Sequence, residues 1–240
     1  MKIKSFILAV VFTVPSLMVF AQKGEVANAK KNYDNFIQLK DANSLPLAIP
    51  NLKSAKTSVD KAVLNEKSAA DPAAWTYKAL IYAEMALMDT VSATSKPLFD
   101  EAQAAHKKAL ELDKNGANKA NIDHAHTALF SQYELNQGVK AYQTNNFADA
   151  YTSFANALTY RPGDTTITYY AGLSAINSKN FDAGIKNYEL LTKTDFSANR
   201  QIYLDLSRLY SMKGDTAKAI SIAGEGATKF KDAADRKSVV

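Results

Sequence analysis

The sequence predicts an all-α fold, a solenoid of about five antiparallel helix hairpins. The composition favours helices, because Ala, Lys and Leu are abundant whereas the 240 residues include only six Pro and nine Gly. In the second half of the chain a pattern of small and aromatic residues recurs after about 34 residues, which is the repeat length. Asn, Asp and Gly stand where such a pattern requires turns.

Residues 1–21 have the pattern of a signal peptide: a positive start, an apolar run from Phe6 to Phe20, and the small residue Ala21 before polar Gln22. We expect cleavage after Ala21. The alternative is an uncleaved anchor, although the stretch is short for a membrane span, which needs about 20 apolar residues. No later segment is apolar enough to cross a bilayer. The sequence therefore predicts a periplasmic or secreted protein with no stable membrane span after cleavage.

The charge and the cysteine content of the chain limit the kinds of partner and site to expect. It carries 29 basic and 24 acidic residues, and loss of Lys2 and Lys4 with the leader leaves a net charge of about +3. Because no long run of like charges occurs, nothing predicts binding to nucleic acid. The absence of cysteine excludes disulfides, thiolate metal sites, a cysteine nucleophile and a lipoprotein signal.

The repeat consists of small and aromatic positions in a fixed order. The first copy contains Gly138, Tyr142, Phe147, Ala150, Phe154, Ala157 and Pro162. The second copy, one repeat length later, contains Gly172, Ile176, Phe181, Gly184, Tyr188, Leu191 and Phe196. The third begins with Leu206 and Tyr210 and continues, after one inserted residue, with Thr216, Ala219, Ala223 and Gly226. This last copy keeps the small positions but loses the aromatic residues of its second helix.

This pattern resembles the tetratricopeptide repeat (TPR) family. The resemblance covers residues 131–164 and 165–198 and is weaker over residues 199–233. It implies that each repeat is a pair of antiparallel helices and that the pairs stack into a right-handed α-solenoid with a concave face. In this arrangement Gly138 lets two helices approach, and Phe154 fills the space toward the next pair.

Turn residues agree with these helix pairs. Asn145-Asn146, Lys179-Asn180 and Gly214-Asp215 fall between the paired helices, where Asn and Asp can cap the second helix. The segment from Arg161 to Asp164 contains Pro and Gly and separates the first pair from the second.

The first half of the chain is a more divergent version of the same arrangement. Asp71-Pro72 indicates an N-cap followed by proline at the first helical position. We expect the partner helix from Phe99 to Leu112, after a Ser- and Thr-rich insertion from Met88 to Pro97. Val26 to Leu39 and Leu47 to Leu64 are interpreted as an earlier pair.

A stripe of apolar residues predicts one long helix over residues 119–144, leading into the best repeat. We therefore divide the chain into the signal peptide (1–21), divergent helix pairs (22–115), three TPR-like repeats (116–233) and a disordered tail (234–240). The last helix, about Thr216 to Phe230, carries more apolar residues than one face needs, so self-association through it is one interpretation.

No catalytic or metal-binding pattern is present. His124 and His126 are two residues apart and point about 200° apart on a helix, which argues against a shared metal. Metal-ligand motifs, nucleophile elbows, phosphate loops and dinucleotide fingerprints are all missing. We expect no enzymatic activity and no cofactor; a hydrolase using His106 with an acidic neighbour is a remote alternative.

The TPR resemblance implies that the first helix of each pair lines the concave surface. It places a peptide-binding groove at Gln132, Val139, Tyr142, Gln143, Tyr169, Leu173, Asn177, Arg200 and Tyr203. Such a mixture suits an extended peptide, because aromatic rings give contact area, amides meet backbone groups and arginine meets a carboxylate. Tyr142 is equally compatible with a packing role.

These observations predict an exported scaffold that mediates protein–protein or protein–peptide interactions in the cell envelope. The expected partners are other envelope proteins or extended peptides. The alternative is a periplasmic helical module that binds a small ligand or glycan, with the Met88–Pro97 insertion as part of its pocket.

Overall fold

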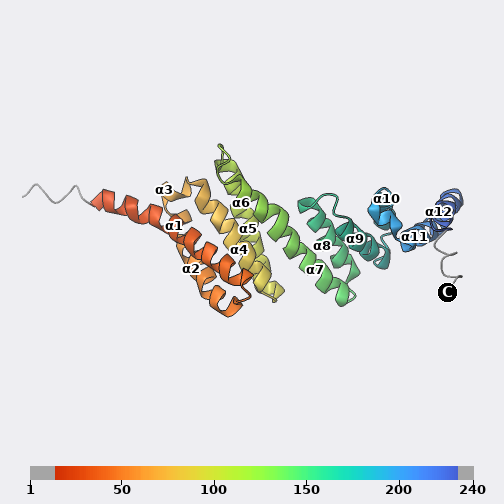
Figure 1. Ribbon diagram of the computed structural model, residues 1–240, viewed down its shortest axis with the longest axis horizontal. Helices are drawn as coiled ribbons and strands as arrows, with labels where there is room; N and C mark the ends of the chain where they lie inside the picture. The colour runs from red at the N-terminus through yellow and green to blue at the C-terminus, as the bar shows by residue number, and fades with distance from the viewer. Residues whose placement is uncertain (1–13, 232–240) are drawn as a thin grey trace, which may run out of the picture. The chain divides into compact units, whose positions relative to one another are not determined.

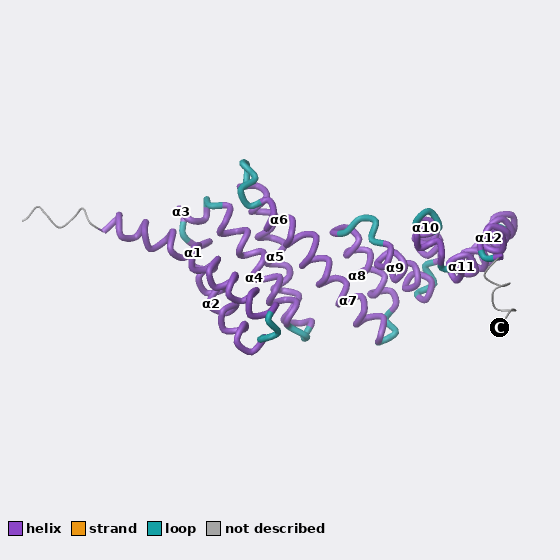
Figure 2. Tube along the Cα trace, viewed as in Figure 1, coloured by secondary structure: helices purple, strands orange, loops and turns teal. Residues whose placement is uncertain are grey.

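The structure is a computed structural model that describes residues 14–231, with side chains for residues 24–231 except Ala198. Helices fill nearly all of this range, and no strand occurs in it (Figures 1 and 2). The predicted all-α fold is confirmed. The described residues form two compact units, the first ending at Phe130 and the second beginning at Ser131.

Two predictions fall largely outside the described residues. Of the signal peptide predicted at residues 1–21, only residues 14–21 are described, as the beginning of helix α1 (Val14–Asp41). The tail predicted at residues 234–240 lies wholly outside. No helix within the described range is both long and apolar enough to cross a membrane.

The first unit contains two helix hairpins. Helix α1 pairs with α2 (Leu45–Leu64), the short helix α3 (Glu66–Ala69) follows, and α4 (Pro72–Met88) pairs with α5 (Ser92–Leu112). Alanines spaced evenly along α2 are fully or almost fully buried: Ala48, Ala55 and Ala62. Small side chains in this row allow the neighbouring helices to approach closely.

A partly buried ion pair joins α1 to α4, with the Lys40 side chain 40 % exposed. Glu84 on α4 is 1 % exposed, and the Lys40 Nζ on α1 donates to both of its carboxylate oxygens, at 2.8 and 2.7 Å. Removal of either partner would leave the other without its counter-charge, which is costly for a buried carboxylate. The pair therefore fixes the position of α1 against α4.

Helix α4 begins as predicted, but α5 begins earlier than predicted. Asp71 accepts a hydrogen bond from the Ala73 N–H at 2.9 Å, and Pro72 is the first helical residue. Residues 92–97, which were expected to form part of an insertion, are helical. Asp89 orders the start of this helix by accepting from the Val91 N–H at 2.9 Å. Pro97 is tolerated because its missing N–H removes only one bond near the helix start.

The long helix predicted over residues 119–144 is present as a continuous helical segment. It comprises α6 (Lys119–His124), a π-helical stretch η1 (Ala125–Phe130) and α7 (Ser131–Gln143). The wider turn of η1 was not expected from the sequence. It carries Phe130, whose ring packs edge-to-face on Phe99 of α5 at 5.3 Å.

The second unit contains three consecutive hairpins (Figure 1). They are α7 with α8 (Phe147–Tyr160), α9 (Thr165–Asn177) with α10 (Phe181–Leu191), and α11 (Arg200–Met212) with α12 (Thr216–Lys229). A 3₁₀ turn, η2 (Asp195–Ala198), precedes α11. Each hairpin also packs on the next, through α8 with α9 and α10 with α11. Together with the first unit, these give the five hairpins expected.

The three turns of the second unit share one backbone geometry. Asn145, Lys179 and Gly214 have positive φ angles of 59°, 63° and 79°. In each turn the following residue donates its N–H to a carbonyl five positions earlier, at 2.8 to 2.9 Å. This is a Schellman-type helix end, which requires a left-handed residue. Only Gly214 adopts that conformation without steric strain, because Asn145 and Lys179 carry a Cβ atom.

The predicted caps are confirmed in two of these turns. The Asn180 side chain accepts from the Ala183 N–H at 3.3 Å, and Asp215 accepts from the Lys218 N–H at 3.0 Å. Asn146 accepts no such bond, and its side-chain nitrogen donates to Asp149 at 2.6 Å.

The same small–aromatic contact holds the first two of these hairpins together. A Cβ atom at Gly138 would lie 2.7 Å from the ring of Phe154, and one at Gly172 would lie 2.5 Å from the ring of Tyr188. Neither ring is more than 1 % exposed. Glycine is therefore required at both positions for the second helix to lie this close to the first.

The Gly172→Ala substitution is expected to destabilise the second unit. The new methyl group meets a buried ring that has no room to move, and such overpacking costs about 1–3 kcal/mol. The matched control is Gly224→Ala on α12, where nothing lies within 4 Å of the added atom, so the helix should gain about 0.5–1 kcal/mol. Urea unfolding followed by far-ultraviolet circular dichroism measures both. Equal midpoints for the two variants would contradict the close approach at Gly172.

Candidate functional site

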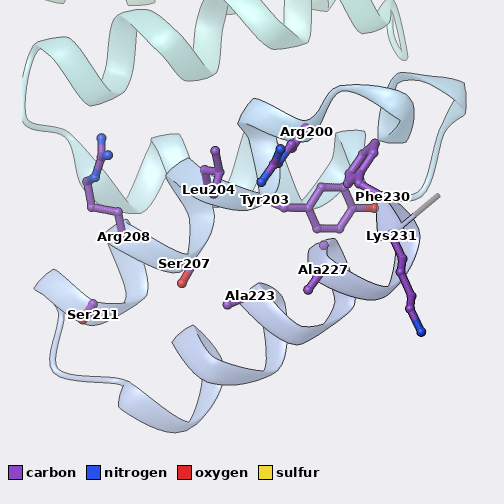
Figure 3. Close-up of a pocket in the computed structure, with 11 residues that line it drawn as sticks. Arg200, Tyr203, Leu204, Ser207, Arg208, Ser211, Ala223, Ala227, Phe230 and Lys231 are labelled. Carbon is purple, nitrogen blue, oxygen red and sulfur yellow. The ribbon is translucent and has the colours of Figure 1, made fainter. Parts of the chain in front are cut away.

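A pocket of about 670 Å³ lies between α11 and α12 in the second unit (Figure 3). From α11 it is lined by Arg200, Tyr203, Leu204, Ser207, Arg208 and Ser211. From α12 and the residues directly after it, it is lined by Ala223, Gly226, Ala227, Phe230 and Lys231. Two of the predicted groove residues, Arg200 and Tyr203, are thus brought together at one site.

Tyr203 forms the inner wall of this pocket. It is 1 % exposed, and its ring meets that of Phe230 edge-on at 5.7 Å. Gly226 permits this arrangement, because a Cβ there would lie 2.8 Å from the Tyr203 Cβ. The Tyr203 hydroxyl is buried and has no hydrogen-bond partner among the described residues. Four other buried hydroxyls of the described residues, those of Tyr33, Ser131, Ser174 and Tyr188, also lack a partner, so this feature is not specific to the pocket.

The rim of the pocket is basic. Its lining includes Arg200, Arg208 and Lys231 and no acidic residue. Arg208 is paired with Asp205 at 3.7 Å, whereas Arg200 has no ion pair among the described residues. In Figure 3 Arg200 lies near Tyr203, and the side chains of Arg208 and Lys231 extend away from it. Lys231 has no ion pair among the described residues either, but Arg200 is the unpaired cation that lies near Tyr203.

The other predicted groove residues lie on α7 and α9, and the structure brings two of them together. The Asn177 Nδ2 donates to the Tyr142 hydroxyl oxygen at 3.1 Å. Val139 is 40 % exposed, and Gln143 is also exposed. The remaining polar and apolar positions, Gln132 and Leu173, are half-buried.

Tyr169 takes part mainly in packing. Its ring stacks on Tyr188 at 5.8 Å with an interplanar angle of 1°, and it contacts Phe196 at 5.3 Å. Burial raises the pKa of Tyr169 above its ordinary value of 10.0. Of the two predicted groove tyrosines on α9 and α11, Tyr169 is half-buried and Tyr203 is buried, so both contribute to the core of the unit.

Sequence reasoning did not identify the α12 side of the pocket. Ala223, Ala227 and Phe230 were not among the predicted groove residues, although Ala223 stands where the preceding repeat has an aromatic residue. The loss of aromatic residues from the last repeat was the available signal.

A histidine pair lies in the first unit. His106 on α5 is 8 % exposed and stacks on His126 of η1 at 5.1 Å, while Phe130 meets His106 edge-on at 5.3 Å. Burial and, second, the charge of His126 lower the pKa of His106, against smaller opposing contributions from the Ile122 carbonyl and Asp123. Within the described range no three His, Cys, Asp or Glu side chains are grouped so that they could hold a metal ion.

No family model and no curated protein matches the chain. Among solved structures, the one from a functional characterization of Pseudomonas aeruginosa PilF is similar, with a TM-score of 0.34 and 16 % sequence identity. The match covers 85 % of this chain and 94 % of that chain. A likeness at this level gives no information about the function of this chain.

The stability of the first unit is expected to fall as the pH drops from about 7 toward 5. His106 has a folded-state pKa below its unfolded value of 6.5, so its contribution is present above that value and is lost on acidification. His106→Phe should flatten this dependence, because phenylalanine keeps the ring contact without titrating. The control is His124→Gln, since His124 is exposed. Thermal melts at several pH values measure the slopes, and equal slopes for wild type and His106→Phe would contradict the assignment.

Proposed function

We propose that the chain is an exported, non-enzymatic TPR-type scaffold that mediates protein–protein or protein–peptide interactions in the cell envelope. One observation carries this proposal: the contact of Gly138 with Phe154 recurs, one repeat length later, as the contact of Gly172 with Tyr188. A contact repeated at this spacing is what a stack of TPR-type hairpins requires. Stacked hairpins form an extended concave binding surface, and the TPR resemblance implies that the first helix of each pair lines it.

The exposed part of α7 and α9 supports binding to an extended peptide. Val139 offers apolar surface, while Gln143 and Asn177 offer amide donors and acceptors for a peptide backbone. The hydrogen bond from Asn177 to Tyr142 already orients one of these amides, so this side chain loses less conformational entropy when a partner binds.

Export is supported by residues 1–21, with their positive start, apolar run and small residue at position 21. The partners of an exported scaffold are proteins of the same compartment. We therefore assign envelope proteins, or extended segments of them, as the ligands.

Processing of the leader is directly testable. Expressed from the full sequence in a bacterium with two membranes, the protein is expected in the periplasmic fraction with Gln22 as its first residue. Ala21→Leu should block cleavage, because the processing enzyme needs a small residue before the cut. Intact-mass measurement and N-terminal sequencing distinguish the two forms. A wild-type chain that keeps residues 1–21 in the cytosolic fraction would contradict export.

The binding surface can be located by photo-crosslinking in an envelope extract. A photoreactive phenylalanine analogue at Val139 or Asn177, on first helices, is expected to give discrete crosslinked partners. The same analogue at Asn156 on α8 or Lys186 on α10, both outside the first helices, is the matched control for second helices. Peptides released from the crosslinked bands identify the partners by mass spectrometry. Equal crosslinking from both sets of positions would overturn the first-helix assignment.

A further inference from the structure

The last hairpin lacks an aromatic ring that both preceding hairpins possess. Phe154 on α8 and Tyr188 on α10 stand one repeat length apart and are at most 1 % exposed. The next equivalent position, allowing for the one inserted residue, is Ala223 on α12. Ala223 is exposed and lines the pocket between α11 and α12.

In the preceding hairpins this ring is enclosed by the following hairpin. Tyr188 shares a hydrophobic cluster with Ile202 and Leu206 of α11. Phe154 shares one with Ile167 and Ala171 of α9. The ring therefore fills the wedge between its own hairpin and the next helix.

Part of the ring arrangement recurs in the last hairpin, although the position of Gly172 is taken there by Leu206, which is fully buried. Tyr169 lies between Tyr188, on which it stacks, and Phe196 at 5.3 Å. Tyr203, one repeat length after Tyr169, meets the ring of Phe230 at 5.7 Å, although with the one inserted residue the position equivalent to Phe196 is Lys231. What is missing is the counterpart of Tyr188, and the pocket of about 670 Å³ opens beside that position. The volume exceeds that of one aromatic side chain, so it also admits the adjoining backbone of a ligand.

The polar groups of the pocket specify the charge of its ligand. The lining contains three basic side chains and no acidic one. Arg200 is exposed and has no ion pair among the described residues, whereas Arg208 is paired with Asp205. A carboxylate beside the incoming ring can accept from the Arg200 guanidinium in a charge-assisted hydrogen bond.

We propose that this pocket binds an extended peptide segment of another protein in which an aromatic side chain stands next to an acidic residue. The aromatic ring enters the pocket beside Ala223, close to Tyr203 and Phe230, and the carboxylate meets Arg200. This inference rests on the proposed scaffold function and names the class of segment bound at its last hairpin.

A second copy of this chain fits the pocket less well. Tyr170 is the one aromatic residue among the well-exposed large apolar side chains of the described residues. Its ring already stacks on Phe154 at 5.8 Å. Its sequence neighbours, Tyr169 and Ala171, are not acidic. The described part of the chain therefore presents no well-exposed aromatic–acidic pair to a second pocket.

The test uses the processed full-length protein and four fluorescein-labelled hexapeptides with blocked ends. They are identical except for the central pair, which is Phe-Asp, Phe-Asn, Ala-Asp or Phe-Lys. Fluorescence anisotropy should show that the Phe-Asp peptide binds about tenfold more tightly than the other three, because both the ring and the charge are needed. The advantage over Phe-Asn should shrink as salt is added.

Two substitutions probe the two halves of the site. Ala223→Tyr supplies the missing ring from the chain itself and should abolish binding of the Phe-Asp peptide while the thermal midpoint stays equal or rises. Ala217→Tyr places the same side chain on an exposed part of α12 outside the pocket and should bind like wild type. Arg200→Gln, at an exposed position, should bring the affinity for Phe-Asp down to that for Phe-Asn.

Several results would overturn the proposal. One is equal affinity for Phe-Asp and Ala-Asp, and another is full binding by Ala223→Tyr or Arg200→Gln. A photoreactive residue at Ala227 reports the occupant itself: adducts with the labelled peptide support the proposal, whereas adducts with a second copy or with residues 232–240 contradict it. If these tests fail while crosslinks from Val139 and Asn177 persist, the scaffold function stands and only the ligand assigned to the last hairpin is wrong.

Discussion

The first two hairpins of the second unit depend on the contact between a glycine in the first helix and an aromatic ring in the second. Because Gly172 has no Cβ, the ring of Tyr188 lies directly over the backbone of α9. The same ring also belongs to a hydrophobic cluster with Ile202 and Leu206 of the next hairpin. One side chain thus sets the distance between two paired helices and also provides the surface on which the following pair packs. Neither pairing nor stacking can change without the other.

The parts of this fold that follow from local chemistry could be predicted from the sequence. The turns at Asn145, Lys179 and Gly214 were located because Asn, Asp and Gly accompany helix ends, and the repeat length fixed the hairpins. The start of α5 was misplaced, because Ser, Thr and Pro usually indicate a loop. There Asp89 organises the first turn, and Ser95 is buried against the rest of the unit. Burial of that kind depends on neighbours distant in sequence, which a local pattern does not contain.

In the candidate site, too, the features set by local sequence could be predicted, and those set by distant neighbours could not. The repeat position identified Arg200 and Tyr203 as neighbours on one helix, but it could not show that Arg200 is exposed and Tyr203 is buried. That difference is decided by α12, where Gly226 lets the helix approach Tyr203 and Phe230 covers its ring. The π-helical stretch η1 and the stacking of His106 on His126 were missed for a related reason. Spacing within one helix says nothing about which residue of another helix lies opposite.

In the first two hairpins of the second unit, the aromatic ring of the second helix is covered by the hairpin that follows. In α12 the ring is replaced by Ala223, so the hairpin does not expose a large aromatic side chain that would need a cover. It exposes instead a pocket with a tyrosine wall and, at the rim, an arginine without an ion pair among the described residues. Filling this pocket with a ring buries apolar surface beside Ala223, so ligand binding draws on the same apolar burial as folding. Apolar burial alone does not discriminate between aromatic partners. Arg200 adds the discrimination, because a carboxylate placed beside the ring gains a charge-assisted bond that a neutral or basic neighbour cannot make.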